Sequence, residues 1–183
     1  ETGHSPSPLN SEAHQGDLSA VLLQNLNPLV NLIRVPKKPI ILMDEWESKI
    51  KAIVENTWNK DVNSLSGVPS WMLVLIKAVL KKTGREYLTD VWPNLEVFFH
   101  GGISFEPYRE QYKTLIPSNK MHYMETYNAS EGFFGLQDDP TDSSLLMMPD
   151  YGIFYEFIPM NEVGNAHPTV LPLESVETLS LIH

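Results

Sequence analysis

Cysteine is absent from the 183 residues of this chain. Its absence excludes disulfides, thiolate nucleophiles and cysteine-ligated metals, and it fits a reducing compartment. Basic residues are scarce: 13 Lys and Arg stand against 23 Asp and Glu, which gives a formal net charge of −10. Because nucleic-acid binding needs clustered positive charge, we expect no nucleic-acid partner.

Long apolar runs are missing as well. No stretch approaches the roughly 18 apolar residues of a membrane span, so we expect no membrane partner. Residues 1–8 are polar and proline-rich, unlike a secretory signal. Together with the lack of cysteine, these features predict a cytoplasmic location. Hydrophobic residues still make up 42% of the chain, which is enough for a packed core.

The hydrophobic pattern divides the chain into three parts. Residues 1–16 lack periodicity and are predicted to be a flexible leader. Residues 17–176 are predicted to form one central α/β unit. Residues 177–183 carry no helix stop or cap, and we interpret them as a truncated tail.

Four segments show the spacing of an amphipathic helix. They are 17–33 with a break at Pro28, a segment from the N-cap Asp44 to Trp58, 71–82 with Ser70 as cap and a stop near Gly84, and a segment from Ser104 or Glu106 to Leu115. The third is apolar nearly all round, which predicts that it is buried.

Strand-like segments alternate with these helices and then follow one another directly. Val62–Ser66, Leu95–Phe99 and Met121–Thr126 are separated by helices, which implies parallel pairing. Three later segments are joined by short turns, which implies antiparallel pairing: Phe133–Gln137, Leu145–Met148 and Ile153–Ile158. The predicted fold class is therefore α/β, with a largely parallel twisted sheet flanked by helices and an antiparallel strand extension after about residue 131.

Two of the predicted strands end in polar, small-residue turns. Gly101-Gly102 comes after the predicted strand Leu95–Phe99, and Tyr127-Asn-Ala-Ser130-Glu131 comes after the predicted strand Met121–Thr126. Ligands of open α/β sheets bind just beyond the carboxyl ends of the strands. A tyrosine can stack on a purine, a serine hydroxyl can hold a phosphate oxygen, and a glutamate can bind Mg²⁺ beside nucleotide phosphates. The two turns together predict a nucleotide–metal site.

Ordinary explanations compete with this hypothesis. An isolated double glycine such as Gly101-Gly102 is more often a plain strand-to-helix turn. The segment 127–131 alone is equally compatible with a capped turn, and its occurrence after the double glycine favours the site. His100 is more typical of a hydrogen-bonded histidine at a strand end than of a catalytic base.

Several motifs together resemble those of a known family. Gly67-Val-Pro-Ser-Trp-Met-Leu73, Phe98-Phe-His-Gly-Gly102 and Tyr127-Asn-Ala-Ser-Glu131 occur in the order used by the adenylate-forming superfamily. In detail the chain resembles the auxin-responsive acyl-acid amido synthetases, most of all their bacterial members. The most specific runs are Trp92–Val97, Tyr123–Gly132 and Tyr155–Pro159. The resemblance covers about Gly16 to Val176.

The resemblance implies a reaction and a set of roles. Such enzymes use ATP and Mg²⁺ to join a small-molecule carboxylic acid to AMP, and then pass the acyl group to an amino acid. It implies that Tyr127 lies against the adenine, that Ser130 holds the α-phosphate and that Glu131 approaches Mg²⁺, the last two being the catalytic candidates. The residues implied to line the adenine and ribose are Gly101, Gly102 and Ile103, and those implied to wall the acyl pocket are Val68, Ser70, Trp71 and Met72.

The chain also departs from the family pattern. It lacks the upstream Ser/Thr/Gly-rich phosphate loop, the downstream Tyr-Arg-x-Gly-Asp motif and the small C-terminal domain with its lysine. Asn128 stands where relatives often carry a smaller residue. We therefore expect a middle segment of an acyl-acid–amino-acid ligase that is inactive as an isolated chain. The alternative is a non-catalytic binding or interaction module that keeps the fold with a vestigial nucleotide site.

Overall fold

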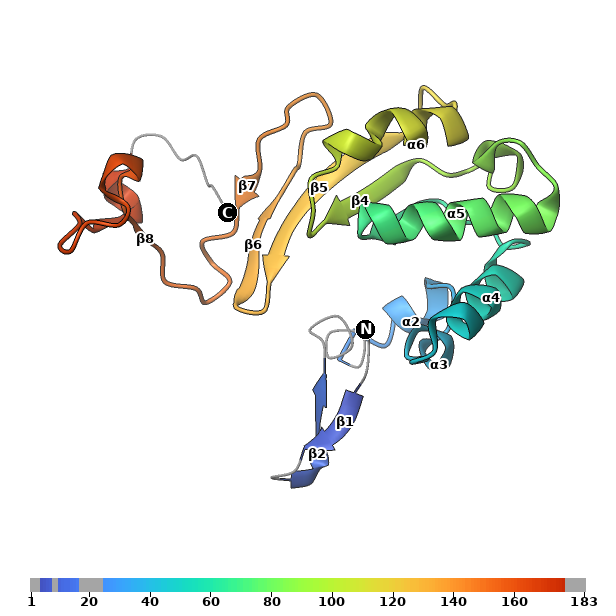
Figure 1. Ribbon diagram of the computed structural model, residues 1–183, viewed down its shortest axis with the longest axis horizontal. Helices are drawn as coiled ribbons and strands as arrows, with labels where there is room; N and C mark the ends of the chain where they lie inside the picture. Colours follow the sequence, from blue (N-terminus) through green and yellow to red (C-terminus); the bar gives the residue numbers. More distant parts are fainter. Residues whose placement is uncertain (1–3, 8–9, 17–24, 177–183) are drawn as a thin grey trace.

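A five-stranded sheet forms the centre of the computed structural model, which describes residues 4–7, 10–16 and 25–176 (Figure 1). The strands, in spatial order, are β3 Ser64–Gly67, β4 Val97–Gly101, β5 His122–Ala129, β6 Gly132–Leu136 and β7 Leu146–Met147. The first three are parallel, and β6 and β7 join antiparallel. The structure confirms the predicted α/β fold with its antiparallel extension after residue 131.

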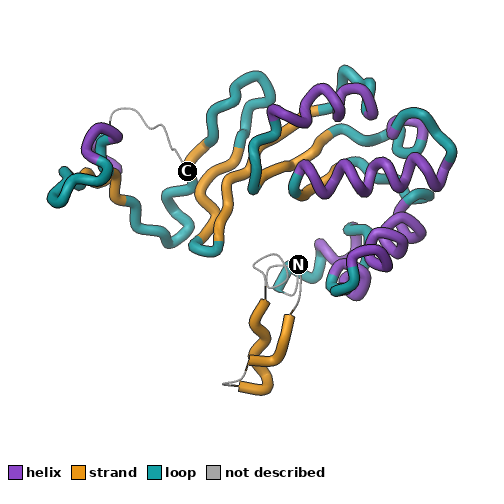
Figure 2. Tube along the Cα trace, in the orientation of Figure 1, coloured by secondary structure: helices purple, strands orange, loops and turns teal. Residues whose placement is uncertain are grey.

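Helices connect the parallel strands and continue before and after them. The α-helices are α2 Val30–Ile33, α3 Lys38–Ile41, α4 Trp46–Thr57, α5 Pro69–Thr83 and α6 Arg109–Leu115. Short 3₁₀ turns are η1 Leu88–Asp90, η2 Glu106–Tyr108, η3 Met160–Glu162 and η4 Leu173–Ser175. Figure 2 shows α4 and α5 lying side by side. No helix in the described ranges is long and apolar enough to cross a membrane.

One face of the sheet is covered by α5 and α6. The strand register aligns Leu65, Phe98 and Tyr123 in a row across β3, β4 and β5. The Phe98 ring stacks on Tyr112 of α6, with 5.1 Å between ring centroids. The Tyr112 hydroxyl in turn donates to the Pro69 carbonyl of α5 at 2.8 Å. Burying this row against both helices provides the main apolar core.

His100 lies on the same face of β4, two residues beyond Phe98, and is buried beside the core. Its side chain is 3% exposed, and its ring stacks on Phe105 with 4.2 Å between centroids. Its Nδ1 atom is buried with no hydrogen-bond partner among the described residues. The prediction that His100 is fully hydrogen-bonded at the strand end is therefore wrong, because its Nδ1 atom has no such bond to a described residue. Burial, and then the positive charge of Arg109, lowers the pKa of His100 from 6.5 to about 4.

The helix caps differ from those predicted. Asp44 does not cap α4: the carboxylate of Glu45 accepts hydrogen bonds from the backbone N–H groups of Glu47 at 2.9 Å and Ser48 at 2.6 Å. A capping side chain must reach the second or third N–H of the helix, and only the residue directly before the first turn is placed to do so. The acidic start still complements the helix dipole.

The other predicted caps are also wrong. Ser70 lies inside α5, which begins one residue earlier at Pro69, where the fixed φ of proline suits the first turn. Neither Ser104 nor Glu106 caps the helix that ends at Leu115, because that segment starts as the 3₁₀ turn η2. The predicted stop of α5 is confirmed, since Gly84 adopts the left-handed conformation with φ of 65°.

The prediction that α5 is buried all round is wrong for one stripe. Trp71 and Val74 are 51% and 46% exposed, although Ile76 and Val79 are fully buried. The helix faces the sheet on one side and α4 on another. On its outer stripe, the Trp71 ring makes a T-shaped contact with Trp46 of α4, with 4.4 Å between the ring centroids.

The regular structure near the two ends of the chain differs from the predicted elements. Within the predicted leader, residues His4–Ser7 (β1) and Asn10–Gly16 (β2) pair as an antiparallel hairpin. The helix predicted for 17–33 falls partly outside the described residues, and its remainder forms α2 after Pro28. The predicted strand 153–158 is reduced to β8, Glu156–Phe157. It pairs with β9, Leu171–Pro172, in a small separate sheet (Figure 1).

Truncating the aromatic row should destabilise the fold. Phe98 is fully buried, so we expect Phe98→Ala to lower the free energy of unfolding by about 3–5 kcal/mol. The matched control is Phe154→Ala, because Phe154 is 82% exposed; it should change stability by no more than about 0.5 kcal/mol. Urea unfolding followed by circular dichroism measures both. Equal losses in the two variants would contradict the assigned core.

Acid should destabilise the fold through His100. Its pKa is about 4 when folded, against about 6.5 for an unfolded histidine, so the unfolded state binds more protons between these values. This contribution to stability is intact above about pH 6.5 and is lost as the pH falls towards 4, for a total of about 3 kcal/mol.

The measurement is the free energy of unfolding from pH 7.5 to 4 in the parent and in two variants. His100→Phe should remove this part of the slope, and His122→Gln, at an exposed position of β5, should retain it. The background titration of carboxylates is common to all three proteins and cancels in the comparison. If the free energy of unfolding of His100→Phe depends on pH as steeply as that of the parent, His100 is not the group that causes the acid destabilisation.

Candidate functional site

The carboxyl ends of the three parallel strands meet at one edge of the sheet. Gly67 at the end of β3 is the Cα partner of His100, and Gly101 at the end of β4 is the partner of Thr126. The structure therefore brings the double glycine and the segment from Tyr127 next to each other. The predicted neighbourhood of the two strand ends is present, at the edge where open α/β sheets bind ligands.

The second turn has a different shape from the one predicted. The strand does not stop at Thr126: β5 runs on to Ala129, beyond the end of β4, and its last residues pair with β6. Ser130 and Glu131 form the tight turn of this β-hairpin and are both exposed. The register shifts between Tyr127 and Asn128, and such bulges change the direction in which side chains point. The hairpin turn presents a hydroxyl and a carboxylate to solvent.

Tyr127 is held by packing at the start of this projecting hairpin. Side chains alternate along a strand, so Tyr127 lies on the same face as Tyr123, whose ring contacts Tyr112 of α6. The Tyr127 ring is partly buried, with its centroid 5.0 Å from that of Phe134 on β6. A partly buried ring supported by a second ring is a suitable platform for stacking a flat ligand.

Gly101 has a structural reason to be glycine. A Cβ atom at this position would collide with the Thr126 carbonyl oxygen and would stand 2.8 Å from Thr126 Oγ1. The lack of a side chain therefore permits close approach of β5, whether or not a ligand binds. Gly102 has a φ of 81°, a left-handed conformation that favours glycine. Ile103 follows and is 40% exposed.

Two of the four residues implied in the acyl pocket approach the strand ends. The Val68 Cγ2 atom lies 3.5 Å from where a Gly102 Cβ would stand, and the Met72 Cε atom lies at the same distance from that of Gly67. Trp71 instead lies against Trp46 of α4. Ser70 is only partly exposed.

The carboxylate at this edge is suited to bind a metal ion only together with a nucleotide. In the described part of the chain, no group of three or more His, Asp or Glu could hold a metal ion. Glu131 is a single exposed carboxylate. Mg²⁺ is often held by one or two carboxylates together with substrate phosphates and water. Glu131 therefore fits a Mg²⁺ ion that arrives with ATP, and it does not fit a site built by protein ligands alone.

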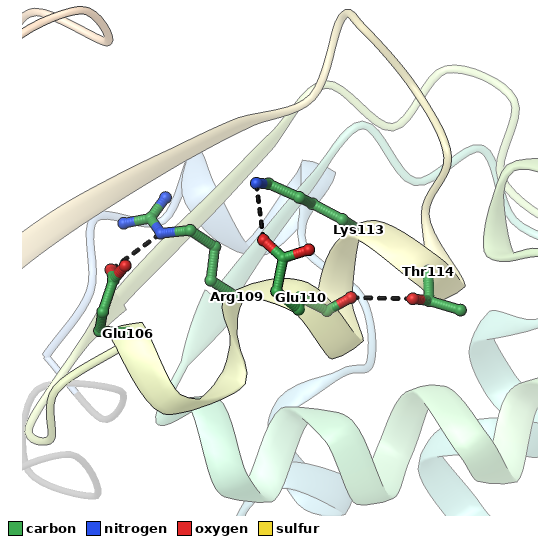
Figure 3. Close-up of polar contacts among 5 residues, drawn as sticks. All are labelled: Glu106, Arg109, Glu110, Lys113 and Thr114. Carbon is green, nitrogen blue, oxygen red and sulfur yellow. Dashed lines mark hydrogen bonds and ion pairs between the residues drawn. The ribbon is translucent and has the colours of Figure 1, made fainter.

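The charged side chains on η2 and α6 are already occupied by local contacts (Figure 3). Arg109 forms an ion pair with Glu106 at 2.9 Å, and its guanidinium lies 5.0 Å from the centre of the Phe105 ring. Lys113 pairs with Glu110 at 2.8 Å. Such exposed pairs contribute little to stability. They also leave Arg109 engaged with protein groups, so we do not assign it to a ligand.

A cavity of about 650 Å³ lies elsewhere, at the carboxyl ends of α4 and α5. Trp58, Lys82 and Asn94 are among its lining residues, and no predicted site residue is. Its lining residues Asp61 and Asn94 precede β3 and β4 in the chain, so the cavity lies at the amino-terminal ends of these strands and away from the candidate edge. The cavity and the candidate site are therefore separate features.

A comparison with models of known protein families identifies the family of this chain. Residues 5–121 match the GH3 family N-terminal domain, which is more than half of the chain. A search of curated proteins finds no match. The matched range begins inside the predicted leader, includes 68–72 and 101–103, and ends before Tyr127. The chain belongs to the GH3 family, the family of auxin-responsive acyl-acid amido synthetases.

Proposed function

We propose that this chain is a segment of an ATP-dependent acyl-acid–amino-acid ligase and that its sheet edge forms part of the nucleotide site. The observation that carries the proposal is the pairing of Gly101 with Thr126, which puts the double glycine beside Tyr127. Family membership supports the ligase class. The geometry of the edge supports the assignment of the nucleotide to it.

The proposed roles follow from what each group offers. The Tyr127 ring, supported by Phe134, stacks on the adenine. The exposed Ser130 hydroxyl donates a hydrogen bond to an α-phosphate oxygen, and the Glu131 carboxylate accompanies Mg²⁺. When bound with ATP, Mg²⁺ would neutralise the negative charge that develops on the phosphate. The backbone of 101–103 lines the adenine and ribose, and Val68 and Met72 face the carboxylic acid.

One observation favours the alternative, a non-catalytic module with a vestigial site. Gly101 and Gly102 are both explained by the fold itself, through the close approach of Thr126 and through a left-handed φ of 81°. A chain that had lost nucleotide binding would therefore keep both glycines. The discriminating groups are Ser130 and Glu131, which are exposed in the hairpin turn and are not held there by core packing.

Pyrophosphate exchange separates the two functions. With ATP, Mg²⁺ and a panel of carboxylic acids, we expect no exchange from the 183 residues alone, because the phosphate loop and the C-terminal domain are not among them. A chain restored with both segments should catalyse exchange, and Glu131→Ala should reduce that exchange strongly. A restored chain that folds but gives no exchange with any acid would favour the non-catalytic module.

Tyr127 should dominate the residual binding of AMP. Several charge-assisted phosphate contacts, each worth about 1.5–3 kcal/mol, are missing, so we expect only millimolar affinity from this chain. Tyr127→Ala should abolish most of it, because stacking is the main contact that remains. Ligand-observed NMR titration measures the affinity, with Tyr87→Ala as control, since Tyr87 lies beyond the far end of α5. Unchanged AMP binding by Tyr127→Ala would refute the adenine assignment.

The same titration tests the metal role. Glu131→Ala should weaken binding only when ATP and Mg²⁺ are both present, because the carboxylate acts through the metal. Binding of AMP without metal should stay at the parental level. A loss of AMP binding in this variant would assign Glu131 to direct contact with the nucleotide or to the shape of the hairpin turn.

A further inference from the structure

Thr126 lies at the point where the paired ends of β4 and β5 separate. Its Cα atom is the partner of Gly101 in the last paired position of the two strands. Its Oγ1 hydroxyl donates a hydrogen bond to the carbonyl oxygen of His100 at 3.0 Å, in a partly buried position. The side chain of Thr126 therefore adds a lateral bond to the backbone pairing just before it ends.

Gly101 and Thr126 fit each other closely, and we call this pair the clasp. The place of a Cβ atom on Gly101 lies 2.8 Å from Thr126 Oγ1, closer than real Cβ contacts. The hydroxyl thus occupies the space that a side chain at position 101 would take. A glycine on one strand and a hydroxyl on the other form a matched contact that a side chain on Gly101 or a reorientation of Thr126 would disturb.

The groups on either side of the clasp are those of the candidate site. Gly102 comes directly after the end of β4, where the backbone turns away with a φ of 81°. Tyr127 follows on β5, directly before the irregular register between Tyr127 and Asn128. Beyond the clasp the two segments part, one towards η2 and the other into the β5–β6 hairpin. The hydroxyl bond is therefore placed to set the distance between Gly102 and Tyr127.

We propose that Thr126 is a positioning residue: its hydroxyl, bonded to the His100 carbonyl, fixes the spacing of Gly102 and Tyr127 across the sheet edge. The effect on nucleotide binding rests on the proposed function, in which these two residues flank the adenine. Thr126 itself does not touch the nucleotide. It acts by holding two groups in register, so that less ordering is needed when a ligand binds.

Two substitutions of Thr126 separate the effect of its hydroxyl from that of its side-chain shape, and a substitution elsewhere serves as control. Thr126→Val keeps the β-branched shape that suits a strand and removes the donor. Thr126→Ser keeps the donor and loses the methyl group. Thr114→Val is the matched control, because the Thr114 hydroxyl also donates to a backbone carbonyl, that of Glu110, at 2.9 Å on α6 (Figure 3).

The experiment combines amide nitrogen relaxation with AMP titration, both by NMR on the full 183-residue chain. In Thr126→Val we expect lower order parameters confined to Gly102 and Tyr127, and AMP binding weaker by about fivefold, the equivalent of one ordinary hydrogen bond. Thr126→Ser and Thr114→Val should match the parent in both measurements. Rescue by serine distinguishes positioning from a general loss of packing.

The outcomes separate this inference from the proposed function. Parental order parameters at Gly102 and Tyr127 in Thr126→Val would overturn the inference. So would lower order spread over the whole sheet, or an equal effect in Thr126→Ser, since either points to packing alone. If the local change occurs but the parent binds no AMP, the positioning of the strand ends is supported and the proposed nucleotide function fails.

Discussion

The parallel pairing of β4 with β5 is the interaction on which the rest of the structure depends. It aligns Val97 to Gly101 with His122 to Thr126, and it requires a crossover helix, which is α6. The same register puts Phe98 and Tyr123 side by side beneath that helix and so builds the core. At its carboxyl end it brings the double glycine next to Tyr127. The core and the candidate site therefore both depend on the pairing of β4 with β5.

That shared origin explains why several residues of the edge serve the fold and the site together. Gly101 is required by the close approach of Thr126, and His100 is a core residue immediately before it. The low pKa of His100 follows from burial and from Arg109, so it reports packing and is no sign of a catalytic base. Perturbed or special residues near a strand end need a geometric reason before a chemical role is assigned.

The family match and the geometry contribute different evidence. The match with the GH3 family N-terminal domain ends at residue 121 and therefore covers the glycines but not the hairpin from Tyr127. The hairpin is joined to the matched part by the pairing of β5 with β4 and by the hydrogen bond from the Thr126 hydroxyl to the His100 carbonyl oxygen. Membership supports the ligase class, whereas the proposed contacts to nucleotide and Mg²⁺ depend on how this hairpin presents Tyr127, Ser130 and Glu131.

The amino-acid sequence alone determined the alternation of helices and strands, the parallel pairing of the first three strands of the sheet and the stop of α5 at Gly84, because periodicity and glycine act locally. Only the tertiary structure decided the rest. Glu45 rather than Asp44 caps α4 since a difference of one residue decides which carboxylate reaches the free N–H groups. β5 continues beyond Thr126 because β6 pairs with it. Gly101 lies close to Thr126 because two strands that are distant in sequence pair with each other. Contacts between distant segments leave no local pattern in the sequence, and these contacts shape the candidate site.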